Sequence, residues 1–362
     1  MSTYVYLQRF LIIAAVLLGF CFTVEAKPAW IQEKAPEVYI VKKGDTLWKI
    51  AGIYLKEPWR WIEIWDRNPN ISNPHLIYPG DKILLSYDAN GTPKLSLERG
   101  SKTPNATYWE GGTRVVKLSP VIRAGEAEGA IPTVPTRVIQ PFFNRSQVIS
   151  QAHVDFCPTV IALDEDHLVV GVGDRIYASK VDAHSATEMF SVFRVEKLYK
   201  DPKNDEVLGI EGLILGNAQV EFMGEPTSLI LKQSYSEIRI GDKLIEPTRE
   251  QVDAFFFPKA PNGNPTGQII SVFDGISQIG QYQVIVITGG RNQFREVGDV
   301  LSIYQKQKDL PTRIRSKKET AYNFPALKVG RLVVFRVFDK VSYGLVMNAT
   351  RPIYLKDEVG EP

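Results

Sequence analysis

The sequence predicts an α+β N-terminal module of strand-helix-helix-strand order, followed by a mainly β region of small barrels or sandwiches. Between positions 45 and 66, apolar residues recur at helical spacing, and runs of aliphatic residues flank this stretch on both sides. Beyond position 87, the apolar runs are short and are separated by glycine, proline, asparagine and aspartate. A chain of 362 residues also exceeds the size at which a single core usually splits into domains.

The composition is that of an ordinary globular protein, with 44% hydrophobic and 23% charged residues. The 43 basic and 41 acidic residues leave a net charge of +2, which creates no domain-wide positive field, so the sequence predicts no nucleic-acid partner. The two cysteines, Cys21 and Cys157, are too few for a disulfide framework or a cysteine-based zinc finger.

Residues 1–26 are predicted to be a signal peptide. Arg9 precedes an apolar run at 10–22, which is too short to cross ~30 Å of hydrocarbon comfortably as a helix. Val24 and Ala26 place small residues at the two positions that a signal peptidase reads. The alternative is an uncleaved N-terminal anchor. Removal of the segment would leave Cys157 as the only thiol, which suits export without disulfides.

A first folded module is predicted at residues 37–86, with strands at 38–41 and 82–85. Asp45 is predicted to cap the first helix, because its carboxylate can accept from free amides of the first turn. Pro58 is predicted to start the second helix. The apolar helix faces are Leu47, Ile50, Ala51 and Tyr54 in the first, and Pro58, Trp61, Ile62 and Trp65 in the second. Because two strands alone are marginal, both helices should cover one face of the sheet.

The stretches 38–51, 68–71 and 76–81 together resemble a LysM domain. The resemblance covers the whole module, with its motifs in the order of the family. It implies binding of polymers that contain N-acetylglucosamine, chiefly peptidoglycan or chitin. Residues 72–75 depart from the family by lengthening the loop before the last strand.

Two loops of this module form the candidate sugar site. N-acetyl sugars carry an amide and hydroxyl groups, which need paired donors and acceptors at an open groove. The predicted peptidoglycan-binding residues are Gly44, Asp45, Thr46, Leu47, Asn70, Ile71, Ser72 and Asn73. The alternative is that the first three only form the turn and the helix cap. Helical spacing favours packing over sugar stacking for four tryptophans, namely Trp48, Trp59, Trp61 and Trp65.

Residues 87–141 are predicted to be a linker with extended segments. A hairpin turn at 88–91 precedes a short strand at 94–97, the stretch 98–113 is interpreted as a linker, and four prolines between 120 and 141 favour extended chain. A β-rich domain is predicted at 142–250 and a second one at 264–357. The second contains strand pairs at 268–273 with 282–287 and at 332–338 with 343–347.

A weak repeat runs through the chain, in which a Gly-Asp pair precedes a short apolar strand. It occurs at Gly80, Gly173, Gly241 and Gly298. The pattern predicts a tight turn with positive φ at glycine, in which the aspartate holds the turn. No Gly-Lys-Ser/Thr follows, so these are not phosphate-binding loops. The basic stretch 306–325 is interpreted as a solvated loop, with contact to an anionic polymer as the alternative.

Six further segments resemble a family of exported LysM proteins, the type IV pilus secretin-associated proteins. These segments are residues 116–120, 130–135, 164–168, 173–177, 273–280 and 335–347. In that family a LysM module holds the wall, and a C-terminal β region similar to the flagellar protein FlgT supports the outer-membrane secretin ring. The resemblance therefore implies a diderm bacterium and a periplasmic location at the peptidoglycan and outer membrane. It also implies the secretin ring as a partner. A homo-multimer around that ring is a separate prediction, because a single LysM module should bind weakly and avidity would compensate.

No catalytic residue, metal site or cofactor is predicted. Cys157 lacks the neighbours of a cysteine wall peptidase and is interpreted as buried and inert. The four histidines include no pair at zinc-ligand spacing, and the acidic run 164–167 is interpreted as a turn, with a divalent-ion site as the alternative.

The sequence thus predicts a non-catalytic peptidoglycan-binding adaptor that anchors or stabilises the secretin of a type IV pilus. Two alternatives stay open. One is a peptidoglycan hydrolase with an unrecognised site, because two facing carboxylates leave no sequence signature. The other is an assembly factor of the flagellum or of another envelope machine.

Overall fold

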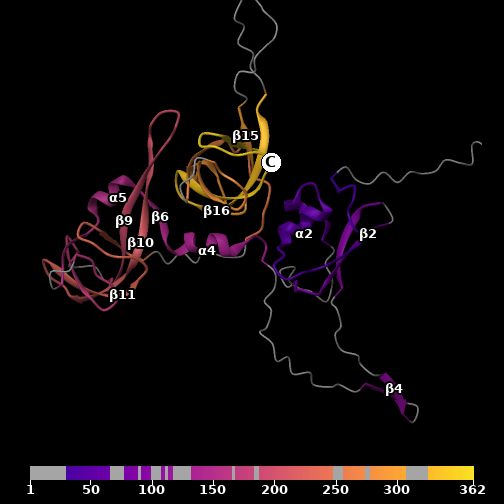
Figure 1. The fold of residues 1–362 in the computed structure, drawn as a ribbon, viewed down its shortest axis with the longest axis horizontal. Helices are drawn as coiled ribbons and strands as arrows, with labels where there is room; N and C mark the ends of the chain where they lie inside the picture. Colours follow the sequence, from indigo (N-terminus) through magenta and orange to yellow (C-terminus); the bar gives the residue numbers. More distant parts are fainter. Residues whose placement is uncertain are drawn as a thin grey trace, which may run out of the picture. The chain divides into compact units, whose positions relative to one another are not determined.

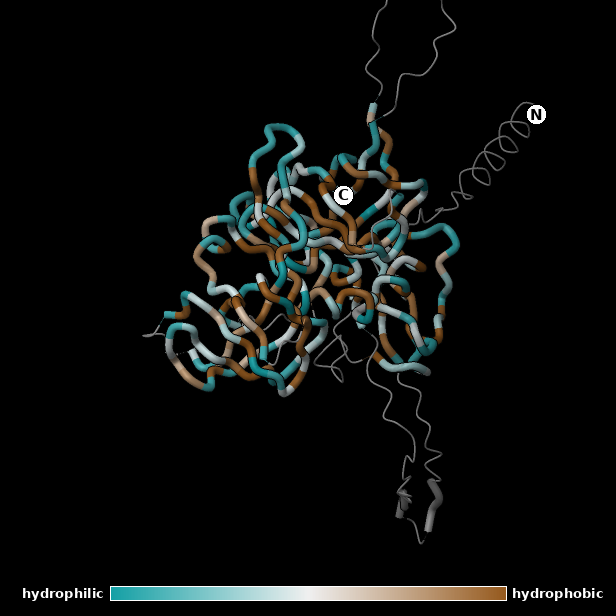
Figure 2. Tube along the Cα trace, turned by 60° about the vertical axis from the view of Figure 1, so that its left-hand side comes forward, coloured by the Kyte–Doolittle hydropathy of each residue, from teal (hydrophilic) through white to brown (hydrophobic). Residues whose placement is uncertain are grey.

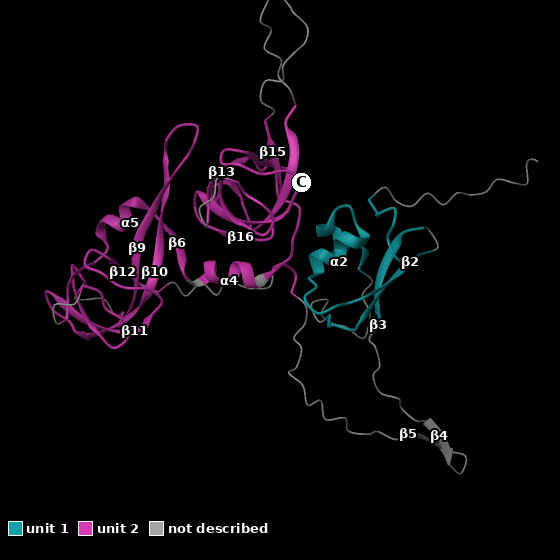
Figure 3. Ribbon diagram, viewed as in Figure 1, with its two compact units in different colours: residues 1–131 teal, residues 132–362 magenta. Residues whose placement is uncertain are grey.

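The computed structural model describes residues 30–65, 77–88, 91–98, 107–110, 113–116, 132–164, 168–182, 187–247, 256–273, 278–306 and 325–362. The chain divides into two compact units, residues 1–131 and 132–362 (Figure 3). The predicted signal peptide and most of the basic stretch at 306–325 lie outside the described residues. Within those ranges, no helix has the length and apolar character needed to cross a membrane.

The first unit contains the predicted strand-helix-helix-strand module. Strand β1 (Val38–Ile40) pairs antiparallel with β2 (Lys82–Tyr87), and α2 (Leu47–Tyr54), the 3-10 helix η1 (Pro58–Arg60) and α3 (Trp61–Ile64) lie between them in sequence. The predicted hairpin after β2 is also present, because β3 (Pro93–Glu98) pairs with β2 along its full length. The sheet of the module therefore has three strands, in the order β1-β2-β3.

The second helical segment differs from the sequence-based expectation. It begins as a 3-10 turn, which has three residues per turn instead of 3.6, so the apolar face is rotated relative to a continuous α-helix. As a result Ile62 is 50% exposed, whereas Trp59 and Ile64 are buried. Packing is confirmed for Trp59 and Trp61, which are both buried. Two ring pairs complete this arrangement, with centroids 6.3 Å apart for Trp48–Trp59 and 5.6 Å apart for Trp61–Trp65.

The interpretation of 98–113 as a plain linker is wrong in one respect. Strand β4 (Thr107–Glu110) pairs antiparallel with β5 (Thr113–Val116) as a two-stranded hairpin. Threonine, tyrosine, tryptophan and valine favour strands, and the Gly-Gly pair between the two strands is a common hairpin connection.

The second unit is built mainly from two barrels of the same topology. The first consists of β7 (Thr159–Leu163), β8 (Arg175–Ser179), β9 (Met189–Lys200), β10 (Val207–Phe222), β11 (Thr227–Ser234) and β12 (Lys243–Ile245). The second consists of β13 (Gly267–Val272), β14 (Val284–Thr288), β15 (Val300–Gln305), β16 (Leu327–Val337), β17 (Val341–Ala349) and β18 (Glu358–Gly360). Figure 1 labels β9, β10 and β11 of the first barrel and β15 and β16 of the second.

Strand pairing closes each barrel in the same order. The second barrel runs β13-β14-β17-β16-β15-β18, and in the first barrel β7-β8-β11-β10-β9-β12 are paired in sequence, with β12 pairing back to β7. An additional strand, β6 (Ser146–Ile149), extends the first barrel by pairing with β10. The predicted mainly β region of small barrels is therefore confirmed. The two predicted strand pairs of the second domain are also present.

The interiors of the two barrels also correspond residue by residue, at an offset of roughly 110 residues. Figure 2 shows hydrophobic and hydrophilic stretches alternating along the chain. Buried pairs at equivalent positions are Val160 and Ile269, Val170 and Ile279, Ile176 and Ile285, Val192 and Ile303, Leu231 and Val346, Ile238 and Ile353, and Leu244 and Val359. The bridge Val170–Ile238 in the first barrel matches the bridge Ile279–Ile353 in the second. The second unit is thus a tandem of one barrel module.

The predicted Gly-Asp turn is confirmed at all four positions, where the glycine has φ between 93° and 96°. Two further copies lack the Gly-Asp pair: residues 280–283, with Tyr282 at φ 65°, and residues 354–357, with Lys356 at φ 71°. In all six turns the side chain of the fourth residue accepts from the backbone N–H of the first, at 2.6–3.0 Å.

Each of these six turns is also paired with an opposite strand. The third residue donates its N–H to a strand carbonyl at 2.7–2.9 Å, and the same strand residue donates its N–H back to the fourth residue at 2.8–3.0 Å. In the first module, Gly80 and Asp81 pair in this way with Val41. We call these six the paired turns.

One expectation for 120–141 is wrong, because its last part is helical. Helix α4 (Thr136–Asn144) begins directly after Pro135 and contains Pro141. A proline inside a helix is costly, but Phe142 packs against Phe273 with ring centroids 4.6 Å apart. Arg336 of the second barrel donates to the carbonyl of Phe142 at 2.6 Å. Tertiary packing therefore overrides the local preference for extended chain.

A buried polar junction follows α4. The Ser146 hydroxyl on β6 hydrogen bonds to the Tyr343 hydroxyl of the second barrel at 2.8 Å, and Arg336 also donates to the Ser146 carbonyl. In the first barrel the Tyr199 hydroxyl donates to the Glu211 carboxylate at 2.7 Å.

Candidate functional site

The candidate sugar-binding turn comprises residues 42–45, which we call the Gly44 turn. Gly44 has φ 85°, the Lys42 N–H donates to Asp45 Oδ2 at 2.8 Å, and the Asp45 N–H donates to the Lys42 carbonyl at 3.1 Å. These are the internal bonds of the six paired turns. A side chain at Gly44 would meet open space, but its positive φ disfavours any residue with a Cβ.

The Asp45 side chain is only 1% exposed and is held by three donors. Besides the Lys42 N–H, the Tyr39 hydroxyl donates to Oδ2 at 2.9 Å and the Lys49 ammonium donates to Oδ1 at 2.9 Å. Burial alone would raise the pKa of Asp45, but hydrogen bonds from Lys49, Lys42 and Tyr39 outweigh it and lower the pKa. Burial and the adjacent carboxylate raise the pKa of Tyr39. The carboxylate is therefore ionised and fully used inside the turn.

The helix cap is Thr46, and the expectation of Asp45 as the cap is wrong. Thr46 has extended backbone angles, and its hydroxyl accepts from the Lys49 N–H at 3.2 Å. The cause is that the Asp45 carboxylate faces backwards into the turn. Leu47 is buried in the core of the module. The side chains of Asp45, Thr46 and Leu47 are therefore committed to structure, and the backbone is what this loop can offer to a ligand.

The Gly44 turn differs from the paired turns in one way. No strand of the described residues lies opposite it, and the Gly44 N–H has no hydrogen-bond partner among them. Directly after the turn the chain enters α2, whose first N–H groups have no acceptor within the helix. We call the Gly44 N–H and the Asp45 carbonyl the open edge. The corresponding groups of the paired turns bind the carbonyl and the N–H of one opposite residue.

The second predicted loop, Asn70, Ile71, Ser72 and Asn73, lies outside the described residues, so its contribution stays a prediction. Sequence reasoning missed Tyr39 and Lys49. Lys49 lies four residues after Asp45, at a separation typical of helical ion pairs, and this spacing was the available signal.

The other candidate chemistry lies in the second unit. Cys157 is buried, and burial raises the pKa of its thiol, which agrees with an inert cysteine. Asp164 forms an ion pair with Arg175 at 3.5 Å, and 165–167 lie outside the described residues. No cluster of three or more histidine, cysteine, aspartate or glutamate side chains suited to a metal occurs in the described part of the chain.

Comparison with known proteins finds the LysM domain family at residues 39–86. Two similar proteins come from Bacillus subtilis (strain 168). The chain is 41% identical over 63 residues to "Uncharacterized protein YqbP", covering 15% of this chain and 29% of that protein. It is 39% identical over 70 residues to "SpoIVD-associated factor A", covering 19% of this chain and 17% of that protein. The matches span less than a third of either relative.

LysM domains bind peptidoglycan, which is compatible with a place in the cell envelope. The geometry of the module and the family match agree on the first unit: residues 39–86 of this chain are a LysM domain.

Proposed function

We propose that this protein is a non-catalytic peptidoglycan-binding adaptor whose open edge holds the N-acetyl group of a wall sugar. One observation carries the proposal: the Gly44 turn has the internal bonds of six other turns, but within the described residues it lacks the opposite residue whose carbonyl and N–H each of those binds. An N-acetyl sugar offers an amide carbonyl as an acceptor and hydroxyl groups as donors. Its carbonyl would accept from the Gly44 N–H, and a hydroxyl of the same sugar, which can reorient, would donate to the Asp45 carbonyl.

The binding is expected to be weak for a single site. Each hydrogen bond contributes about 1 kcal/mol net, because it replaces a bond to water. Several copies of the chain on one wall polymer would raise the effective affinity by avidity. This need for avidity supports the proposed homo-multimer.

The second half of the proposal is a partner in the envelope. The resemblance to type IV pilus secretin-associated proteins supports an outer-membrane secretin ring as that partner and the periplasm as the location. The tandem barrels of the second unit supply a large scaffold for such a contact. Burial of Cys157 and the raised pKa of its thiol argue against the alternative of a cysteine wall hydrolase.

The wall-binding half is tested by sedimentation of the mature full-length chain with purified sacculi. The chain should pellet with native sacculi, lose binding to chemically de-N-acetylated sacculi, and regain it after re-acetylation. Gly44→Ala should bind less than Gly91→Ala, which is the matched control because both glycines have positive φ and open space around them. Failure of the wild-type chain to pellet would contradict the proposal, and a cleared band on a peptidoglycan zymogram would contradict its non-catalytic part.

The partner half is tested by cross-linking in the native envelope followed by purification of the chain. Recovery of a secretin supports the proposal. Recovery of flagellar ring proteins instead would favour the flagellar alternative.

A further inference from the structure

The buried carboxylate of Asp45 accepts hydrogen bonds from side chains of two different residues. In the paired turns, the opposite strand braces the turn from outside through two backbone hydrogen bonds. The Gly44 turn has no such strand among the described residues, and its carboxylate instead accepts from the Tyr39 hydroxyl and the Lys49 ammonium. Two side chains therefore brace this turn, which no opposite strand braces among the described residues.

The two donors come from different elements. Tyr39 lies in the middle of β1, opposite Ile83 of β2, and Lys49 lies in the first turn of α2. Asp45 thus ties the strand, the turn and the helix to a single carboxylate. The bond from Lys42 N–H to the same Oδ2 atom transmits this restraint to the backbone of the turn, and hence to the left-handed Gly44.

We propose that Tyr39 and Lys49 are positioning residues for the glycan, which hold the open edge in its binding geometry without touching the sugar amide. The inference rests on the proposed function, because it concerns the same turn. It extends that function by naming the side chains that keep the Gly44 N–H and the Asp45 carbonyl aligned in the absence of ligand. Preorganisation of this kind raises affinity by removing the cost of ordering the turn on binding.

The inference also gives glycan binding a defined pH dependence. The titratable groups that face Asp45 are Tyr39 from β1 and Lys49 from α2, and the turn itself contributes the Lys42 backbone N–H. The carboxylate must be ionised to accept all three donors. Because the pKa of Asp45 is lowered in the folded protein, binding should persist at mildly acidic pH and be lost only as pH falls through that lowered value.

Lys49→Met removes the ammonium and should raise the pKa of Asp45, so that binding is lost at a higher pH than in the wild type. Lys49 is 60% exposed, so this variant should fold with little change in melting temperature. Its affinity at neutral pH should fall by roughly fivefold, as expected for the loss of one charge-assisted hydrogen bond. Lys49→Arg should return the pH at which binding is lost to the wild-type value. The control variant Lys94→Met, on β3 of the same sheet, should bind as the wild type does.

The experiment is isothermal titration of the mature full-length chain with a soluble N-acetylglucosamine oligomer, from neutral to acidic pH. Tyr39→Phe should weaken binding in the same manner, with thermal melts to confirm folding. If the wild-type chain binds and Lys49→Met loses binding at the same pH as the wild type, this inference alone is overturned. A wild-type chain that does not bind the oligomer at all would overturn the proposed function, and this inference with it.

Discussion

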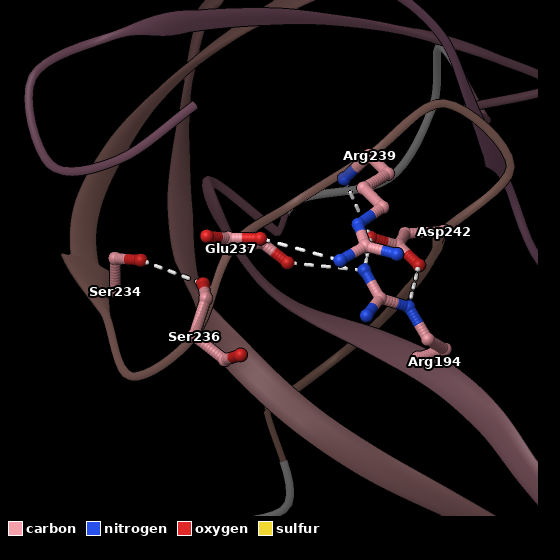
Figure 4. Close-up of polar contacts among 6 residues, drawn as sticks. All are labelled: Arg194, Ser234, Ser236, Glu237, Arg239 and Asp242. Atoms are coloured by element: carbon pink, nitrogen blue, oxygen red, sulfur yellow. Dashed lines mark hydrogen bonds and ion pairs between the residues drawn. The ribbon is translucent and has the colours of Figure 1, made fainter. Parts of the chain in front are cut away.

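Arg194 in the first barrel and Gln305 in the second occupy equivalent positions and reach equivalent acceptors. Arg194 donates to both carboxylate oxygens of Asp242 at 2.8 Å and to the Glu237 carbonyl at 3.0 Å (Figure 4). Gln305 donates to Asp357 Oδ2 and to the Pro352 carbonyl, both at 3.4 Å. Each pair joins a strand to the paired turn that precedes the last strand of its barrel. The tandem modules thus share one clamp, which is charged in the first copy and neutral in the second.

Replacing Gln305 with arginine should stabilise the second barrel. Burial raises the pKa of Asp357, and this effect exceeds the opposite effect of the hydrogen bonds from Tyr354 and Gln305. The ionised carboxylate is therefore incompletely stabilised by its present partners. Gln305→Arg would supply a charge-assisted pair and should add about 1 kcal/mol, or a few degrees in melting temperature. Thermal unfolding at pH 7 checks this. A melting temperature below that of the wild type would contradict the equivalence of the two clamps.

The reverse exchange in the first barrel should be destabilising. Arg194→Gln removes the bidentate pair and leaves the buried Asp242 carboxylate with the Arg239 N–H as its remaining donor among the described residues. Because Arg194 is itself partly exposed, the expected loss is about 1–3 kcal/mol, below the cost of breaking a fully buried pair. Urea unfolding measures the change. Arg239→Gln serves as the control, since its side chain pairs with exposed Glu237 at the surface. A loss equal to that of Arg194→Gln would contradict the prediction.

Glu211 should make the second unit less stable as pH rises. Its carboxylate is 6% exposed, and burial raises its pKa, against the hydrogen bond from Tyr199 and the charge of Lys197. A carboxyl whose pKa is higher in the folded than in the unfolded state stabilises the fold when protonated, so its contribution is lost as pH rises from the unfolded value through the folded one. Glu211→Gln keeps an acceptor for Tyr199 and should flatten this slope. Melting temperatures between pH 4 and pH 8 test it, and an unchanged slope in the variant would rule out Glu211 as its source.

Truncation of Phe142 should weaken the packing of α4 on the second barrel. Its ring lies 4.6 Å from Phe273 and 6.4 Å from Phe335, and it is half-buried. Phe142→Ala should therefore cost about 2 kcal/mol, less than the value for a fully buried phenylalanine. Hydrogen exchange should show faster opening of residues 136–149. Exchange at wild-type rates would show that this helix does not depend on the aromatic contact.

Sequence reasoning succeeded where the signal is local. The module at 39–86, its two strands and the Gly-Asp turns all follow from spacing and turn chemistry within a few residues. Asp45 shows the limit of that reasoning. Its residue type is typical of a helix cap, but its carboxylate accepts hydrogen bonds inside the turn, and Thr46 caps the helix. The orientation of the Asp45 carboxylate depends on the hydrogen bond from Tyr39, a residue of β1 that lies next to the turn only in the folded module.

The tandem barrels were hidden from the sequence for a different reason. Two of the equivalent turns use Tyr282-Gln283 and Lys356-Asp357 in place of Gly-Asp, so the visible repeat had irregular spacing. The interiors preserve burial but not residue identity, as where Ala178 matches Ile287. Pairing between distant strands, which no local pattern encodes, is what reveals the duplication.

The amide resonance of Gly44 gives the most direct test of sugar binding at the open edge. In the full-length chain labelled with 15N-glycine, titration with an N-acetylglucosamine oligomer should shift the Gly44 amide saturably. The amides of Gly80, Gly173, Gly241 and Gly298 already donate to strand carbonyls and should not move. A saturable shift confined to the Gly44 turn and its surroundings is the predicted result, whereas a Gly44 amide that stays fixed while the oligomer binds would place the sugar elsewhere.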